Sequence, residues 1–277
     1  MPLQPKGFST GLLEQVLARL GLSDRPEPTL DGLRTLYAAW SRKVPFDNVR
    51  KLIHLHSRAP GPLPGDSPAQ FLADWLAYGT GGTCWAGNGA LQAVLTALGF
   101  DASRGIATML VAPRALPNHG TVVVACEGTR HVVDASILHG APLPLDASAP
   151  TDVAHPAWGV QCRRRDGTWH IHWRPLHKPD GLECRLEQLQ ATPESFCERH
   201  EATRGWSPFN YELYARSNRG DAVVGVARGQ RVVFDGACVH QTALGADERQ
   251  RVLIDELGMR EEIVQRLPPD TPTPPPP

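Results

Sequence analysis

The sequence predicts an α+β protein in which helices and strands occupy separate parts of the chain. Through the first hundred residues, apolar side chains recur with the spacing of amphipathic helices. From residue 101 onward, β-branched runs joined by short turns replace this pattern and predict antiparallel strands. Helical spacing returns only near the carboxyl end. Because strands and helices do not alternate regularly, a parallel sheet is not expected.

Four helices are expected in the first hundred residues. Each combines a capping or glycine-rich start, an apolar stripe, and a glycine or proline stop. In the third, Ser67 is the expected cap and Pro68 the first helical residue. The stretch 56–68 is rich in proline and glycine and is expected to form a loop. The four segments, from first capping or helical residue to stop, are 9–21, 29–45, 67–79 and 84–99.

The strands are expected to form three hairpins. The first two hairpins turn at glycine-containing dipeptides. A helical stretch over 247–267, interrupted at Gly258, closes the folded part of the chain. The proline-rich end, 267–277, is expected to be extended and disordered. The expected hairpin segments are 120–126 with 130–137, turning at Glu127-Gly128; 159–173, turning at Asp166-Gly167; and 220–236.

Composition excludes several classes of partner. The formal net charge is −1, so bulk charge indicates neither a nucleic acid nor an anionic membrane as a ligand. The amino end has no apolar run long enough for a signal peptide or a membrane span. We therefore expect a cytoplasmic protein whose six cysteines are reduced. No C-x-x-C pair occurs. His170 and His172 are expected to share one strand face, and the same interpretation is open for His54 and His56, but neither pair has a third ligand, so no metal is expected.

The stretch YGTGGTCWAGNGAL, residues 78–91, surrounds Cys84 with glycines where a helix is expected to begin. Glycine lets a ligand approach the backbone closely. The free N–H groups and positive dipole of a helix start favour a thiolate. A buried structural thiol is the commonest fate of a free cysteine. The glycines and the helix start favour a nucleophile instead.

A cysteine nucleophile needs a base, and the base needs an orienting group. His119 begins one predicted strand, and Asp134 lies in the next. If the turn consists of residues 127–128, the alternation of side chains places both on one face, diagonally adjacent. A turn of three residues would place them on opposite faces. His131, expected on the other face, and His139, expected in the loop beyond, are the alternative bases.

Three segments resemble those of the arylamine N-acetyltransferase family. VPFDNV at 44–49 is similar to the family's I-P-F-E-N-L segment. GGTCWAGNGALQAVLTALGF at 81–100 is similar to its R-G-G-x-C-x-E-x-N-x-L segment. NHGTVVVACEGTRHVVDAS at 118–136 resembles its H-x-x-L-x-V … D-V-G-F-G segment, with the same separation of histidine and aspartate. Weaker likeness continues at 207–221 and 253–259, so the likeness covers most of the chain. The three segments together are fairly specific.

The resemblance implies a fold of three regions around a core like that of the cysteine proteases. These are an N-terminal helical bundle over 1–100, a central antiparallel β-barrel over 101–205 and a C-terminal α/β lid over 206–266. The disordered tail at 267–277 would follow. The resemblance also implies an enzyme that moves an acetyl group from acetyl-CoA, or another acyl-CoA, to a small-molecule amine.

The resemblance assigns roles to individual residues. Cys84 would carry the acyl group as a thioester, His119 would be the base and Asp134 its orienting carboxylate. Supporting roles would fall to Asn88 and Asp47. Contacts with the substrate would fall to Phe46, Trp85 and Ile137.

The sequence also departs from the family. Thr80 stands where the family has an arginine, and Asp47 where it has a glutamate. In the family this arginine and glutamate form a pair that braces the triad. Here the pair is absent or rebuilt, with Arg50 as the candidate partner. Ile137 takes the place of a pocket aromatic. The chemistry is therefore better supported than a preference for arylamines. Three alternatives stay open: an amide synthase that takes a larger acyl group from CoA or an acyl carrier protein, a cysteine hydrolase with the same triad, and a catalytically inactive binding protein.

Overall fold

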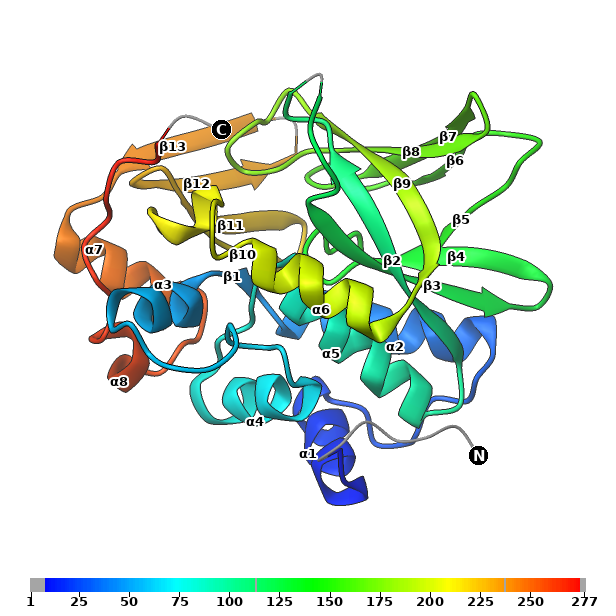
Figure 1. The fold of residues 1–277 in the computed structure, drawn as a ribbon, viewed down its shortest axis with the longest axis horizontal. Coiled ribbons are helices and arrows are strands. Elements are labelled where there is room, and N and C mark those ends of the chain that lie inside the picture. The colour runs from blue at the N-terminus through cyan, green and yellow to red at the C-terminus, as the bar shows by residue number, and fades with distance from the viewer. Residues whose placement is uncertain (1–7, 113, 237, 275–277) are drawn as a thin grey trace.

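The computed structural model describes residues 8–112, 114–236 and 238–274. Its elements follow the predicted order of helices, antiparallel strands and a mixed closing region. Figure 1 shows most of the amino-terminal helices below, an eight-stranded sheet at the upper right and a five-stranded sheet at the upper left. Helix α6 (Pro193–Ala202) runs across the middle of this view.

The amino-terminal helices form where capping residues and apolar stripes predict them. The side chains of Ser9 and Ser67 accept hydrogen bonds from the first turns of α1 and α4. Their apolar stripes pack into one core together with β-strand residues such as Val122. Among the described residues, no helix is both long and apolar enough to cross a bilayer. The helices are α1 (Thr10–Leu20), α2 (Leu30–Lys43), α3 (Val49–His56), α4 (Pro68–Tyr78) and α5 (Cys84–Ala97).

Helix α3 was not expected from the sequence, because it follows Pro45 closely and is only eight residues long. It changes the interpretation of two histidines. His54 and His56 lie on this helix and not on one strand, so residues two apart point in different directions. The interpretation of this pair as neighbours on one strand face is therefore wrong.

The eight-stranded sheet is antiparallel throughout and nearly closes into a barrel. The hydroxyl of Thr151 in β6 donates to the carbonyl of Pro144 in β5 at 2.5 Å, so the two outermost strands approach each other. The strand order is β5-β4-β3-β2-β9-β8-β7-β6. The strands are β2 (Asp101–Met109), β3 (His119–Cys126), β4 (Thr129–Val133), β5 (Leu143–Pro144), β6 (Thr151–Val153), β7 (Val160–Arg165), β8 (Thr168–Trp173) and β9 (Leu182–Ala191).

The first hairpin has the two-residue turn that the sequence predicts. Glu127 and Gly128 both have positive φ, 50° and 77°, as a tight hairpin turn requires. Cys126 therefore lies opposite Thr129. This register sets which side chains of β3 and β4 share a face, so it decides the geometry of the site described below.

The five-stranded sheet joins two distant parts of the chain. Its first strand, β1, comes from the segment that follows α2, while the other four come from the closing region. Helix α7 (Ala246–Arg251), a π-helical segment (Val252–Glu256) and α8 (Glu261–Val264) follow the last strand. The order is β1 (Phe46–Asp47), β10 (Ala215–Arg219), β11 (Ala222–Ala227), β12 (Gln230–Asp235) and β13 (Cys238–Ala243).

The disordered tail predicted from residue 267 is wrong for its first residues. The carboxylate of Asp270 accepts the N–H of Leu213 at 2.9 Å and pairs with Arg249 at 2.8 Å. The N–H of Thr271 donates to the carbonyl of Tyr211 at 2.9 Å. These bonds hold the segment against the residues that lead into β10. Residues 275–277 of that prediction lie outside the described part of the chain.

Candidate active site

Cys84 is the first residue of α5, and its side chain is buried. The Thr83 side chain makes no capping hydrogen bond there, so the first turn of the helix keeps free N–H groups. These groups and the helix dipole create a positive potential beside the sulfur atom. The sequence predicted this placement of Cys84 at a helix start.

The hairpin register brings His119 and Asp134 together. His119 opens β3, Asp134 follows β4, and His119 Nε2 lies 2.8 Å from Asp134 Oδ2. Both side chains are buried. The charge of Cys84 also acts on the imidazole, so the thiol lies on the same side of the molecule as this pair. A paired imidazole and carboxylate therefore lie near the thiol.

The charges of these groups stabilise one another. Burial lowers the pKa of His119, but the charges of Asp134 and Cys84, with the hydrogen bond to Asp134, outweigh burial and raise that pKa to about 10. Burial raises the pKa of Asp134, whereas the charge and hydrogen bond of His119 hold it well below its usual range. At neutral pH, the carboxylate therefore stays ionised and stabilises an imidazolium beside the sulfur atom.

Asn88 links all three elements that carry these groups. Its Nδ2 donates to the carbonyl of Cys84 at 3.0 Å, to that of Gly120 at 2.7 Å and to Asp134 Oδ1 at 3.4 Å. Its Oδ1 accepts the N–H of Ala135 at 2.9 Å. One buried amide thus ties α5 to the start of β3 and to the loop after β4.

Tyr37 braces the loop that carries Asp134. Helical spacing places this side chain in the apolar stripe of α2, where it lies fully buried. Its hydroxyl donates to the carbonyl of Asp134 at 2.8 Å. It also accepts the N–H groups of Asp134 at 3.0 Å and His139 at 3.1 Å. The apolar pattern predicts the burial of Tyr37 but gives no signal for this role of the hydroxyl.

Tyr37→Phe is expected to lower the free energy of unfolding by about 3 kcal/mol, because it leaves buried backbone groups of the loop without partners. Urea denaturation of both proteins measures this difference. The matched control is Tyr78→Phe, since the Tyr78 hydroxyl has no hydrogen-bond partner among the residues described. An equal, small effect of both substitutions would contradict the bracing role.

Asp47 holds the glycine-rich loop in front of Cys84. It is fully buried, and its Oδ2 accepts the N–H of Gly81 at 2.6 Å while its Oδ1 accepts that of Val49 at 3.0 Å. Burial raises the pKa of this carboxyl to about 6. Asp47 therefore acts on the loop through backbone hydrogen bonds.

The suggestion that Arg50 rebuilds the bracing ion pair with Asp47 is wrong. Arg50 pairs with Asp74 of α4, because α3 directs its side chain toward that helix. Thr80, at the position of the family's arginine, is fully buried, and its hydroxyl has no partner within the described part of the chain.

The three residues expected to contact substrate lie on different elements and pack against different neighbours. Phe46 is half-buried on β1 and meets the ring of Phe209 edge to face at 5.3 Å. Trp85 is buried against Phe196 of α6, at 4.9 Å. Ile137 is buried in the core of the barrel. Phe209 was missed from the sequence, because nothing local places it beside Phe46.

The alternative histidines do not join the site. Successive side chains of a strand point to opposite faces, and His131 is three residues from Asp134. His131 therefore lies on the other face of β4. The Nδ1 of His139 bonds to the carbonyl of Ala141 at 2.8 Å, and burial lowers the pKa of this histidine to about 4. Among the described residues, no group of three or more His, Cys, Asp or Glu side chains is placed to hold a metal ion.

The amino-acid sequence is similar to a known family of acetyltransferases. A family model described as N-acetyltransferase matches residues 29–174. An arylamine N-acetyltransferase of Mycolicibacterium smegmatis is 28% identical over 175 residues, which cover 58% of this chain and 62% of that protein. An arylamine N-acetyltransferase / N-hydroxyarylamine O-acetyltransferase of Salmonella typhimurium is 26% identical, over 61% of each chain. The alignments thus span less than two thirds of these relatives.

The fold is shared more widely than the sequence. The arylamine N-acetyltransferase of Mycobacterium marinum, solved in complex with CoA, superimposes with a TM-score of 0.78. The superposition covers 92% of this chain and 98% of that chain, at 18% identity. It confirms the predicted fold class, with its helical amino-terminal part and antiparallel barrel.

Proposed function

The chain belongs to the arylamine N-acetyltransferase family, and from this premise we propose that it transfers an acetyl group from acetyl-CoA to an amine through a thioester on Cys84. The observation that carries the proposal is the buried pair of His119 and Asp134, whose imidazole feels the charge of Cys84 at the start of α5. The fold shared with a relative solved in complex with CoA supports acetyl-CoA as the donor.

In the first half-reaction, His119 holds the proton of the Cys84 thiol, and the sulfur attacks the thioester carbonyl of acetyl-CoA. The carbon–sulfur bond to CoA breaks, and His119 returns the proton to the leaving CoA sulfur. In the second half-reaction, the amine nitrogen attacks the acetyl group on Cys84. His119 takes a proton from that nitrogen, and the Cys84 sulfur leaves. Asp134 keeps the imidazole oriented and stabilises its charged form throughout.

Steady-state kinetics with acetyl-CoA and an amine test this proposal. We expect acetylated amine and free CoA in equal amounts, with the parallel-line pattern of a ping-pong mechanism. Continued release of CoA without an amine, beyond the one equivalent that acetylates Cys84, would favour a cysteine hydrolase. Absence of CoA release with every acyl thioester offered would favour an inactive binding protein.

Simple anilines and hydrazines are expected to be slow acceptors, because Ile137 supplies no aromatic edge. Such an edge contributes about 0.5–1.5 kcal/mol beyond its area, which corresponds to a loss of up to roughly tenfold in kcat/KM. Aliphatic amines should lose nothing by the change. The measurement compares kcat/KM for anilines and aliphatic amines, using acetyl-CoA, longer acyl-CoA thioesters and an acylated carrier protein. Anilines with acetyl-CoA as the best pair would contradict this expectation.

A further inference from the structure

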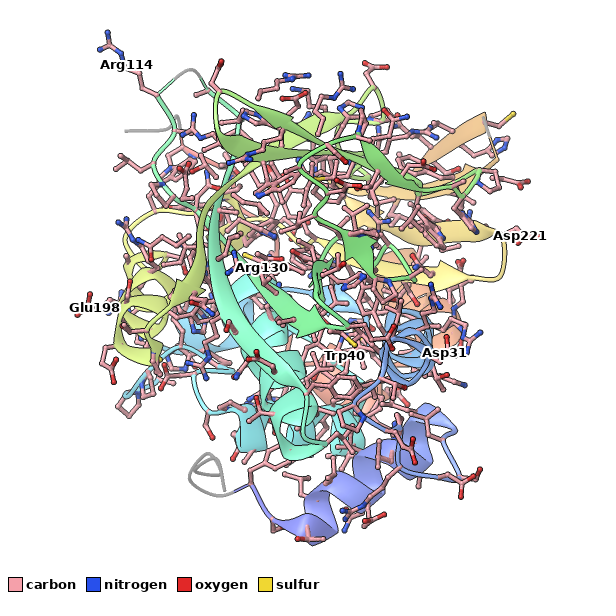
Figure 2. All side chains as sticks on the ribbon, turned by 90° about the vertical axis from the view of Figure 1, so that its right-hand side faces the viewer. Asp31, Trp40, Arg114, Arg130, Glu198 and Asp221 are labelled. Carbon is pink, nitrogen blue, oxygen red and sulfur yellow. The ribbon has the colours of Figure 1, made fainter. Side chains whose placement is uncertain are left out.

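Arg216 is a buried cation. Charged side chains such as Asp31, Glu198 and Asp221 project from the surface in Figure 2, whereas Arg216 is only 4% exposed. Within the residues the structure describes, none of the ion pairs includes it. A buried charge is costly unless a counter-charge meets it, so this arginine needs an explanation.

The guanidinium is only partly satisfied by the described residues. Nη1 donates to the carbonyl of Arg174 at 3.3 Å, and the group lies over the ring of Trp173, 5.5 Å from its centroid. Nε is buried and has no partner among the described residues. Burial lowers the pKa of Arg216 to about 10, so it remains charged at neutral pH. The side of the guanidinium that carries Nε is the side that binds a carboxylate through two parallel hydrogen bonds.

Strand pairing and packing connect Arg216 to residues of the candidate active site. Arg216 in β10 is the register partner of Phe46 in β1, and directly paired residues of antiparallel strands project from the same face. Trp173, which the guanidinium covers, packs in the same core cluster as Ile137. The charge of Asp134 also acts on Arg216. Arg216 is therefore linked to two of the three expected substrate contacts, to Phe46 by strand pairing and to Ile137 through Trp173.

Lys51 is another buried cation near Cys84, but its ammonium group has hydrogen-bond acceptors within the chain. Its Nζ donates to the hydroxyl of Thr203 at 2.9 Å and lies 3.5 Å from the carbonyl of the same residue. The charge of Cys84 acts on its pKa, which burial lowers to about 8. Because Lys51 has acceptors from its own chain, it does not require an external anion.

We propose that Arg216 binds a carboxylate carried by one of the two substrates, either the amine or the acyl group. This inference rests on the proposed acyl transfer at Cys84. It adds a charged specificity contact that the resemblance does not assign. A hydrogen-bonded contact to a charged group corresponds to roughly a 10- to 100-fold effect on kcat/KM.

Two matched substrate series distinguish the sources of the carboxylate. The acceptor series compares 3- and 4-aminobenzoate with the corresponding aminobenzamides, using acetyl-CoA. The donor series compares succinyl-CoA with butyryl-CoA, using one uncharged amine. The wild-type protein is expected to prefer the charged member of one series by roughly 10- to 100-fold in kcat/KM. No preference in either series would overturn the proposal.

Substitutions of Arg216 test whether this residue causes the preference for the charged substrate. Arg216→Met is expected to remove it, and Arg216→Lys, which keeps the charge without the planar edge, to retain part of it. The matched control is Arg219→Met at the exposed end of the same strand, which should keep the wild-type ratio. A preference that survives Arg216→Met would overturn the proposal. If Arg216→Met does not fold, the ratio for Arg216→Lys decides, and an unchanged ratio counts against the proposal.

Binding measurements separate this inference from the proposed function. Calorimetric titration of the protein with aminobenzoate and aminobenzamide, and of Cys84→Ala with succinyl-CoA and butyryl-CoA, needs no turnover. The carboxylate site is supported, even if acetyl transfer fails, when the charged ligand binds more tightly and Arg216→Met removes that difference. For the acyl-CoA ligands, Arg216→Met is combined with Cys84→Ala. Equal binding within both pairs overturns it even if acetyl transfer occurs.

Discussion

Replacing Cys84 with serine is expected to lower kcat/KM for acetyl transfer by about 10⁴-fold or more, as loss of the nucleophile does in other covalent enzymes. A hydroxyl is a far weaker nucleophile than a thiol at neutral pH. The fold should survive, because serine differs by one atom and Cys84 lies in a small buried cluster with Trp85, Ile106 and Phe196. Initial rates of CoA release and thermal melting of both proteins measure the two effects.

The matched control is Cys238→Ser, on the exposed edge of β13. It removes another thiol and should leave kcat/KM unchanged. A Cys84→Ser protein that keeps more than about a hundredth of the wild-type rate would argue against covalent transfer through this residue.

Asp134→Asn is expected to lower acyl transfer by about 10⁴-fold while the fold is kept, as in serine triads. The amide retains one oxygen to accept the N–H groups of Ser136 and Ile137, which Asp134 Oδ1 binds at 2.9 and 3.0 Å. It loses the charge that stabilises the imidazolium of His119 at 2.8 Å. Single-turnover acetylation of Cys84 and thermal melting check both parts of this prediction.

Asp146→Asn is the matched control, because Asp146 makes the same kind of turn. Its Oδ1 accepts the N–H and the hydroxyl of Ser148 at 2.8 and 2.6 Å, as Asp134 does with Ser136, but on the exposed surface. This variant should keep the wild-type rate. If Asp134→Asn folds and retains more than about a tenth of that rate, Asp134 is not the orienting group.

Local patterns predicted the parts of the fold that depend on neighbours in sequence. Caps and apolar stripes placed α1, α2, α4 and α5, and the turn at 127–128 fixed the register that joins His119 to Asp134. The same reasoning missed the short helix α3 and the strands β2 and β9, whose stability comes from tertiary contacts. It also assigned disorder to the segment around Asp270, which long-range hydrogen bonds hold in place.

The supporting contacts of the site could not be predicted in this way. Asn88 bonds to groups far along the chain, and Tyr37 bonds to the loop after β4. Arg216 reaches Phe46 only because β1 joins a sheet whose other strands come from the carboxyl-terminal part. Spacing along one segment carries no information about such partners. The resemblance supplied Asn88 and Asp47, but it gave no indication of Tyr37 or Arg216.

The central claim is that Cys84 carries the acyl group, and the intact mass of the protein tests it most directly. The protein is incubated with acetyl-CoA without an amine, quenched in acid, and analysed whole and as peptides. The predicted result is the mass of one acetyl group, located on the peptide that contains Cys84, and its loss to the acceptor when an amine is added. An acetyl group on another residue, or amine acetylation without any acetyl-protein and at the same rate in Cys84→Ser, would contradict the claim.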